Sequence, residues 1–289
     1  MTKILPLFLF ICLSFQLTAC TQNSGEAGVN QPKTIQTPDS HPKTVEVPSG
    51  VKNTVYEPNP DENILLLTLN RDKQIFYQDK QPDDASLKTV LTEYSEKHKK
   101  DPSTTGSKLP PYLVENAKSF YIKADVSLPF SQILKVLKAV QESSPTSYRA
   151  KFIVRPAEEA GKFEKTPNGR HVVNFDLGIP EKNNAMPRPN PLFLAMKLDA
   201  AGKITLNNSP VERSQLKDTL LKIFKGREQS GVFEEGANEV IKRLALFPAP
   251  DVKYGDVIKF VDELNETLAK VEFGDLGNYM TGPLEVKPD

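Results

Sequence analysis

The side chains that most often perform chemistry are sparse in this sequence and stand far apart. The three histidines, His41, His98 and His171, share no spacing typical of metal ligands. The chain has no Gly-x-Ser-x-Gly motif and no phosphate-binding glycine loop. Both cysteines, Cys12 and Cys20, lie near the start, so no later residue can form a disulfide or a thiolate metal site. We therefore expect a protein that is not an enzyme and that holds no metal and no cofactor.

Cys20 follows a segment with the pattern of a secretory signal peptide. A lysine precedes an apolar run over residues 4–17, and this run is too short for a stable membrane span. The stretch Leu17-Thr18-Ala19-Cys20 resembles a bacterial lipobox, in which the cysteine becomes the lipidated N-terminus. We expect a signal peptide over residues 1–19 and acyl chains, such as palmitate, on Cys20 that bind a membrane. The alternative is a plain signal peptide that happens to contain a cysteine.

Composition limits the classes of partner and indicates the linkers. The 289 residues include 37 basic and 37 acidic side chains, so the formal net charge is zero and nucleic acid is not expected as a partner. The 24 prolines cluster between the periodic segments. Residues 20–61 are rich in Pro, Ser, Thr and Gly, which predicts a disordered tether. Residues 180–191 predict a Pro-rich linker, and residues 277–289 a tail.

The periodic segments occur twice in the same order. Each series predicts a β-hairpin, a helix, a strand, a second helix and a closing strand, beginning near residue 64 and again near residue 192. Apolar residues of the hairpin and first helix match at an offset of 129: Ile75 with Ile204, Leu87 with Leu216, and Leu91 with Leu220. The later segments match at an offset of 124: Phe130 with Tyr254, Ile133 with Val257, and Leu137 with Val261. This pattern indicates an internal repeat.

The repeat predicts an α+β fold with two tandem two-layer domains, over residues 62–179 and 192–276. We expect each domain to contain a small mixed β-sheet with two helices packed on one face. The segment after Gly169 predicts one further strand in the first domain. Four aromatic residues at apolar positions are expected in the core: Tyr121, Phe130, Tyr254 and Phe260.

The repeated unit resembles the periplasmic domain of the ExbD/TolR family of biopolymer-transport proteins. The resemblance lies in the stretches EVIKRLALFPAPDVKYGDVIKFVDEL and KLDAAGKITLNNSPV of the second copy, and in KADVSLPFSQILKVLKAV of the first. Family members dimerise through this domain, so the resemblance implies that the two fused copies could form an intramolecular pseudo-dimer. The family's transmembrane helix, with its proton-handling aspartate, has no counterpart here, and lipidated Cys20 takes its place.

The resemblance implies a binding or coupling role in an energised transport or envelope-integrity system. Implied partners are ExbB/TolQ-like proteins, a TonB/TolA-like transducer or peptidoglycan; the alternative is a scaffold lipoprotein that binds peptidoglycan or outer-membrane proteins. We expect a location in the bacterial cell envelope, facing the periplasm, and in sorting patterns Thr21 favours the outer membrane. Asp125, Tyr254 and Asp256 are candidate partner-binding residues. Asp256 and Asp251 could instead only cap a helix, and the hairpin edges could accept an extended peptide.

Overall fold

The computed structural model describes residues 44–58, 65–77, 80–99, 119–143, 148–157, 169–173, 177–179 and 192–277. Within these ranges it has mixed α+β structure with four α-helices and three β-sheets, which confirms the predicted fold class at this level. The predicted signal peptide, Cys20, the linker over 180–191 and most of the tail lie outside the described residues.

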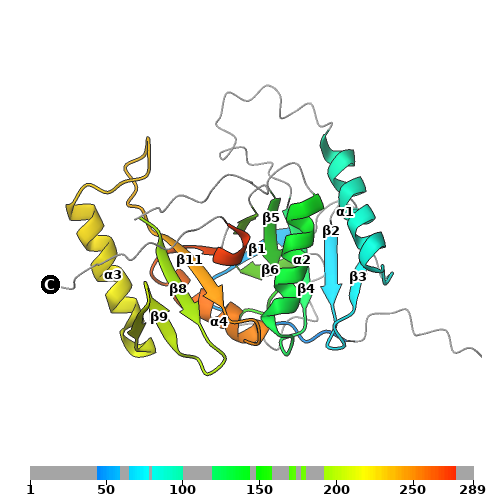
Figure 1. Ribbon diagram of the computed structural model, residues 1–289, viewed down its shortest axis with the longest axis horizontal. Coiled ribbons are helices and arrows are strands. Elements are labelled where there is room, and N and C mark those ends of the chain that lie inside the picture. Colours follow the sequence, from blue (N-terminus) through cyan, green and yellow to red (C-terminus); the bar gives the residue numbers. More distant parts are fainter. Residues whose placement is uncertain are drawn as a thin grey trace, which may run out of the picture. The chain divides into compact units, whose positions relative to one another are not determined.

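The first five-stranded sheet has the strand order β3-β2-β4-β5-β7. Its β2 is antiparallel to β3 and parallel to β4, β4 is parallel to β5, and β5 is antiparallel to β7. Helices α1 and α2 lie side by side against this sheet (Figure 1). The bounds are β2 Leu65–Leu69, β3 Ile75–Tyr77, α1 Asp84–Lys99, β4 Ser119–Ala124, α2 Phe130–Ser143, β5 Tyr148–Phe152 and β7 Leu177–Ile179.

The second five-stranded sheet has the strand order β10-β9-β8-β11-β12. A two-residue turn joins β9 to β10, and both of its residues, Asn207 and Asn208, have positive φ, as a type I′ hairpin requires. The strand β10, which follows the β8–β9 hairpin, was not predicted, although asparagine adopts positive φ more readily than most residues. The bounds are β8 Leu194–Leu198, β9 Ile204–Leu206, β10 Ser209–Val211, α3 Arg213–Gln229, β11 Arg243–Pro248, α4 Tyr254–Asn265, β12 Lys270–Phe273 and a short 3-10 helix η5 Gly274–Leu276.

The strand pairings of the two sheets correspond residue by residue. Leu65 pairs with Phe120 in the first sheet, and Leu194 pairs with Leu244 in the second. These partners are related by the offsets of 129 and 124 that relate the sequences. The β2–β3 and β8–β9 pairs correspond in the same way. Equivalent registers place equivalent residues on equivalent faces, because a slip of one residue would turn every side chain to the other face.

One hydrophobic core takes side chains from both sheets and from all four helices. Helix α4 contributes five large side chains at intervals of one to three residues, all at most 1% exposed: Val257, Ile258, Phe260, Val261 and Leu264. Tyr121, Phe130, Tyr254 and Phe260 are all buried, which confirms their predicted place in the core. The shared core means that the described parts of the two halves are stabilised together.

The segment over residues 44–58 corrects the predicted tether. Val45, Val47 and Val51 are buried, and β1 (Thr54–Pro58) pairs antiparallel with β6 (Gly169–Val173). The prediction of disorder up to residue 61 is therefore wrong for residues 44–58. The polar composition of this segment is typical of disorder, but contacts with distant parts of the chain order it.

One local prediction also needs correction. The single strand expected after Gly169 is two strands, since β6 pairs with β1 and β7 pairs with β5. The first turn of α1 is capped by Asp83, whose carboxylate accepts a hydrogen bond from the Ser86 N–H at 2.6 Å.

Candidate functional site

The junction between the two halves is built from the N-termini of α2 and α4. The N–H of Phe130 donates to the carbonyl of Val252 at 2.7 Å, and the N–H of Tyr254 donates to the carbonyl of Leu128 at 2.7 Å. The first N–H groups of a helix have no partner within it. Each helix therefore receives from the other half the acceptors that its own turn lacks.

A second pair of hydrogen bonds extends this arrangement. The N–H of Ser131 donates to the carbonyl of Pro250, and the N–H of Gly255 donates to the carbonyl of Val126, both at 3.1 Å. Ser131 and Gly255 are equivalent at the offset of 124, as are Val126 and Pro250. Reciprocal contacts between equivalent residues are the defining feature of an isologous, two-fold interface.

Aromatic side chains pack across the junction with the same reciprocity. Phe130 of α2 lies 4.8 Å from Phe273 of β12, and Tyr254 of α4 lies 5.9 Å from Phe152 of β5, measured between ring centroids. Phe152 and Phe273 also meet edge to face at 6.3 Å. The burial of Tyr254 raises its pKa, and its hydroxyl has no hydrogen-bond partner among the described residues. At the equivalent position Phe130 carries no hydroxyl.

Gly255 permits a close approach of the two halves. A Cβ atom at this position would lie 3.1 Å from Cβ of Val126 and 3.2 Å from its carbonyl oxygen. These distances are shorter than ordinary van der Waals contacts. A side chain at this position would therefore push Val126 away by a few tenths of an ångström and lengthen the hydrogen bond between them.

Of the predicted partner-binding residues, Asp125 is fully buried. Its carboxylate accepts hydrogen bonds from the N–H (3.0 Å) and Oγ (2.6 Å) of Ser127 and from the N–H of Glu46 (3.3 Å), and Arg71 lies 3.6 Å away. Burial opposes its ionisation, but these hydrogen bonds and Arg71 outweigh that effect and hold the pKa of Asp125 below its usual value. A carboxylate satisfied in this way holds the turn before α2 and is not exposed to a partner.

The other predicted residues have mixed outcomes. Tyr254 is also completely buried, so its predicted contact with a partner is wrong for this structure. Asp256 is exposed in the first turn of α4, where its charge favours the helix N-terminus. Asp251 does not cap α4, because the N-cap is Lys253 and no side chain caps it. Cys20 lies outside the described residues.

Asp262 of α4 holds the N-terminal segment against the second half. Its carboxylate accepts hydrogen bonds from the N–H groups of Lys52 (2.9 Å) and Asn53 (2.8 Å) and from Nδ2 of Asn53 (3.0 Å). The same segment is bonded to the first half, since the N–H of Val126 donates to the carbonyl of Glu46 at 2.8 Å. We call residues 44–58 the strap, because they bind both halves. Sequence reasoning missed Asp262, which reads as an ordinary charged residue of an amphipathic helix.

The outer edges of the hairpins offer little to an extended peptide. In β3, Tyr77 already exchanges two backbone hydrogen bonds with Lys80, at 2.8 and 3.0 Å. In β10, the central residue is Pro210, which has no backbone N–H to give to another strand. The bonded Tyr77 and the proline each limit the pairing of a further strand at a sheet edge. The structure thus gives little support to the expectation of peptide binding at these edges.

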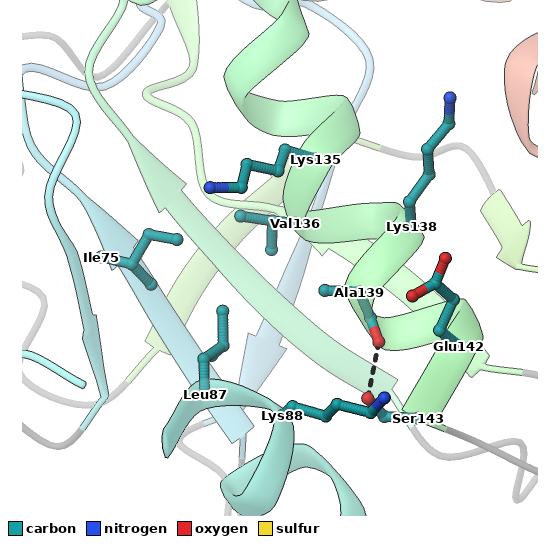
Figure 2. Close-up of a pocket in the computed structure, with 9 residues that line it drawn as sticks. All are labelled: Ile75, Leu87, Lys88, Lys135, Val136, Lys138, Ala139, Glu142 and Ser143. Carbon is teal, nitrogen blue, oxygen red and sulfur yellow. Dashed lines mark hydrogen bonds between the residues drawn. The ribbon is translucent and has the colours of Figure 1, made fainter. Parts of the chain in front are cut away.

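A pocket of about 290 Å³ lies between α1, α2 and β3 (Figure 2). Its apolar lining is formed by Ile75, Leu87, Val136 and Ala139, and its polar lining by Lys88, Lys135, Lys138, Glu142 and Ser143. Lys135 extends from α2 toward Ile75, whereas Lys138 and Glu142 leave the helix on its other side. The Ser143 hydroxyl donates to the carbonyl of Ala139 at 2.7 Å. Lys88 and Lys135 therefore extend beside an apolar floor, whereas the charged ends of Lys138 and Glu142 lie on the other side of α2.

The described residues contain no group of three or more His, Cys, Asp or Glu side chains that could hold a metal ion. Within the same ranges, none of the helices has both the length and the apolar character of a membrane span. Comparison of the chain with family models, with curated proteins and with solved structures found no match.

Proposed function

We propose that this chain is a non-enzymatic, lipid-anchored protein of the bacterial cell envelope that serves as a binding or coupling component. In this proposal its two halves are tandem copies of one ExbD/TolR-like two-layer domain, joined as an intramolecular pseudo-dimer. The acyl chains on Cys20 bind the membrane, and the folded part faces the periplasm. The system served is an energised biopolymer-transport or envelope-integrity system, with ExbB/TolQ-like or TonB/TolA-like proteins as partners.

The observation that carries the proposal is the reciprocal pair of hydrogen bonds that joins Phe130 to Val252 and Tyr254 to Leu128. Domains of the family that the sequence resembles act as dimers. In this chain each fused copy supplies hydrogen-bond acceptors to the helix N-terminus of the other. One chain would therefore contain the arrangement that a dimer has between two chains. The repeated order of hairpin, helix, strand, helix and strand supports the same resemblance.

The lipid anchor is tested by fractionation of cells that express the full chain or the Cys20→Ala variant. The wild-type protein should pellet with membranes, whereas the variant should be found in the soluble fraction, because loss of the acyl chains removes the buried methylene groups. A variant that remains membrane-bound would contradict lipid anchoring.

The coupling role is tested by crosslinking in intact cells, followed by purification of the lipidated protein. Recovery of an ExbB/TolQ-like or TonB/TolA-like protein would support the role. Recovery of only peptidoglycan or outer-membrane proteins would contradict it and favour the alternative, a scaffold lipoprotein. The proposed pseudo-dimer predicts a protein mass corresponding to 32.2 kDa or slightly less in solution, and a mass near twice that value would contradict it.

A further inference from the structure

The groove between α1 and α2 has an equivalent in the second half, between α3 and α4. At the offset of 124, Val136 corresponds to Phe260, Ala139 to Glu263, and Glu142 to Glu266. At the offset of 129, Lys88 corresponds to Lys217. The two grooves can therefore be compared position by position within one molecule.

The second groove is occupied by its own side chains. The ring of Phe260 is covered by the guanidinium of Arg213, whose central carbon lies 5.4 Å from the ring centroid. Arg213 in turn forms two hydrogen bonds with the Glu263 carboxylate, at 2.9 and 2.6 Å. Lys217 pairs with Glu266 at 3.0 Å. An aromatic ring and two carboxylates thus supply the apolar and anionic groups at this position.

The first groove lacks the aromatic ring and the carboxylate of Glu263, whereas Glu142 keeps the position of Glu266. Val136 and Ala139 are smaller than Phe260 and Glu263, and the pocket of about 290 Å³ is found beside them. Position 138 is also reversed in charge, since Lys138 stands where the second half has Asp262. The lysines that extend beside the apolar floor of the pocket are Lys88 and Lys135, whereas Lys138 leaves α2 on its other side (Figure 2).

We propose that the first groove binds a peptide segment of a partner protein that presents a large apolar or aromatic side chain next to carboxylates. The apolar side chain enters between Leu87, Val136 and Ala139. The carboxylates face Lys88 and Lys135, which lie on opposite sides of the pocket floor. The occupant thereby supplies from outside what Phe260 and Glu263 supply within the second half. Charge complementarity identifies its chemistry.

The strap shows that this molecule already holds an extended segment on the equivalent helix. Lys52 and Asn53 bind Asp262 of α4, and the ammonium of Lys52 lies 3.4 Å from Glu266. In this contact a lysine of the strap meets a carboxylate of α4, and α2 carries Lys138 where α4 has Asp262. The inference concerns the groove alone and does not depend on the lipid anchor or the transport role.

The test uses the purified full-length chain and a fluorescent peptide, Glu-Phe-Leu-Glu-Glu, with binding measured by fluorescence anisotropy. The peptide should bind saturably and more weakly as salt is added, because its carboxylates meet exposed lysines. The charge-reversed peptide Lys-Phe-Leu-Lys-Lys should not bind. Absence of saturable binding, or equal binding of the two peptides, would overturn the proposal.

Two variants locate the site. Ala139→Glu places in the groove the carboxylate that the second half has at this position, and Lys88→Glu combined with Lys135→Glu reverses the charge of its rim. Each should weaken binding by about tenfold or more, since charge-assisted contacts are lost or replaced by repulsion. Lys88 and Lys135 are exposed, so their substitution should not disturb the packing of the core. The double variant therefore tests the site even if Ala139→Glu destabilises the protein.

The matched control is Lys222→Glu on the exposed face of α3, outside the groove. It should bind the acidic peptide as the wild type does. Equal weakening in this control would indicate a general charge effect and overturn the proposal. Failure of peptide binding would leave the membrane release of Cys20→Ala unchanged, so the two hypotheses are tested separately.

Discussion

Phe130 and Tyr254 begin their helices at one junction, and each donates its backbone N–H over 2.7 Å to a carbonyl in the turn that precedes the other. The two residues are equivalent in the sequence repeat. Their reciprocal bonds satisfy helix N-termini that would otherwise need side-chain caps or water. The junction is therefore part of both helices, and disturbing it should destabilise both halves.

Gly255→Val should destabilise the protein. The added Cβ would lie 3.1 Å from Cβ of Val126, and overpacking of this kind costs about 1–3 kcal/mol. The matched control is Gly226→Val in α3, where a Cβ atom would meet nothing within 4 Å. Urea unfolding should show a lower free energy of unfolding for the first variant and no loss for the second. Equal effects in the two variants would contradict the steric role of Gly255.

Tyr254→Phe should leave stability unchanged or raise it by about 1 kcal/mol. The substitution removes a buried hydroxyl that has no described partner, and the cost of such a group is about 1–3 kcal/mol. Phe130 shows that phenylalanine is accepted at the equivalent position. Tyr254→Ala is the comparison, with an expected loss of about 3–5 kcal/mol from the aromatic contacts. A clear loss of stability in Tyr254→Phe would mean that the hydroxyl has a partner.

Asp262→Ala should release the strap from α4. The N–H groups of Lys52 and Asn53 would lose a charged acceptor, at a cost of about 1.5–3 kcal/mol. Hydrogen exchange at these two amides should become faster. Asp256→Ala, an exposed position on the same helix, should leave their exchange unchanged. Slow exchange in both variants would show that the carboxylate does not hold the strap.

Asp125 should make stability depend on pH in the acidic range. Its folded pKa lies below the unfolded value of about 3.9, so its contribution is fully present above that value and is lost as pH falls through the folded pKa. Asp125→Asn should therefore be less stable than the wild type at neutral pH, and the difference should shrink as the pH falls below about 4. Urea unfolding of the two proteins between neutral pH and pH 3 measures this difference. A constant difference would contradict the linkage.

The helices and the strands β2, β3, β4, β5, β8, β9, β11 and β12 could be predicted from the sequence, because local periodicity indicates them. Leu87 and Leu91 of α1, for example, face the core for the same reason as their counterparts Leu216 and Leu220 of α3. The strap could not be predicted in this way. It is polar and rich in proline, and its order depends on Asp125 and Asp262, which lie far away in the sequence.

The roles of the candidate site residues also depend on contacts that the sequence does not show. Tyr254 and Asp125 were predicted to contact a partner, but both are buried within the chain. Gly255 reads as an ordinary glycine near a helix start, and only the distance to Val126 reveals its steric role. The pocket depends on the difference between Val136 and Phe260. That difference in side-chain size is visible in the aligned repeat. The volume of the pocket, however, depends on how the helices pack, which the sequence does not show.

The reciprocal junction also affects how two copies of the chain can meet while they fold. The N–H groups of Phe130 and Ser131 receive acceptors from residues 250–252, and the ring of Phe130 packs on Phe273. A first half that folds before the second half is in place exposes an open helix end and an aromatic surface. The second half of a neighbouring chain offers the same acceptors and the same ring, so two chains that fold close together have a defined route to exchange halves.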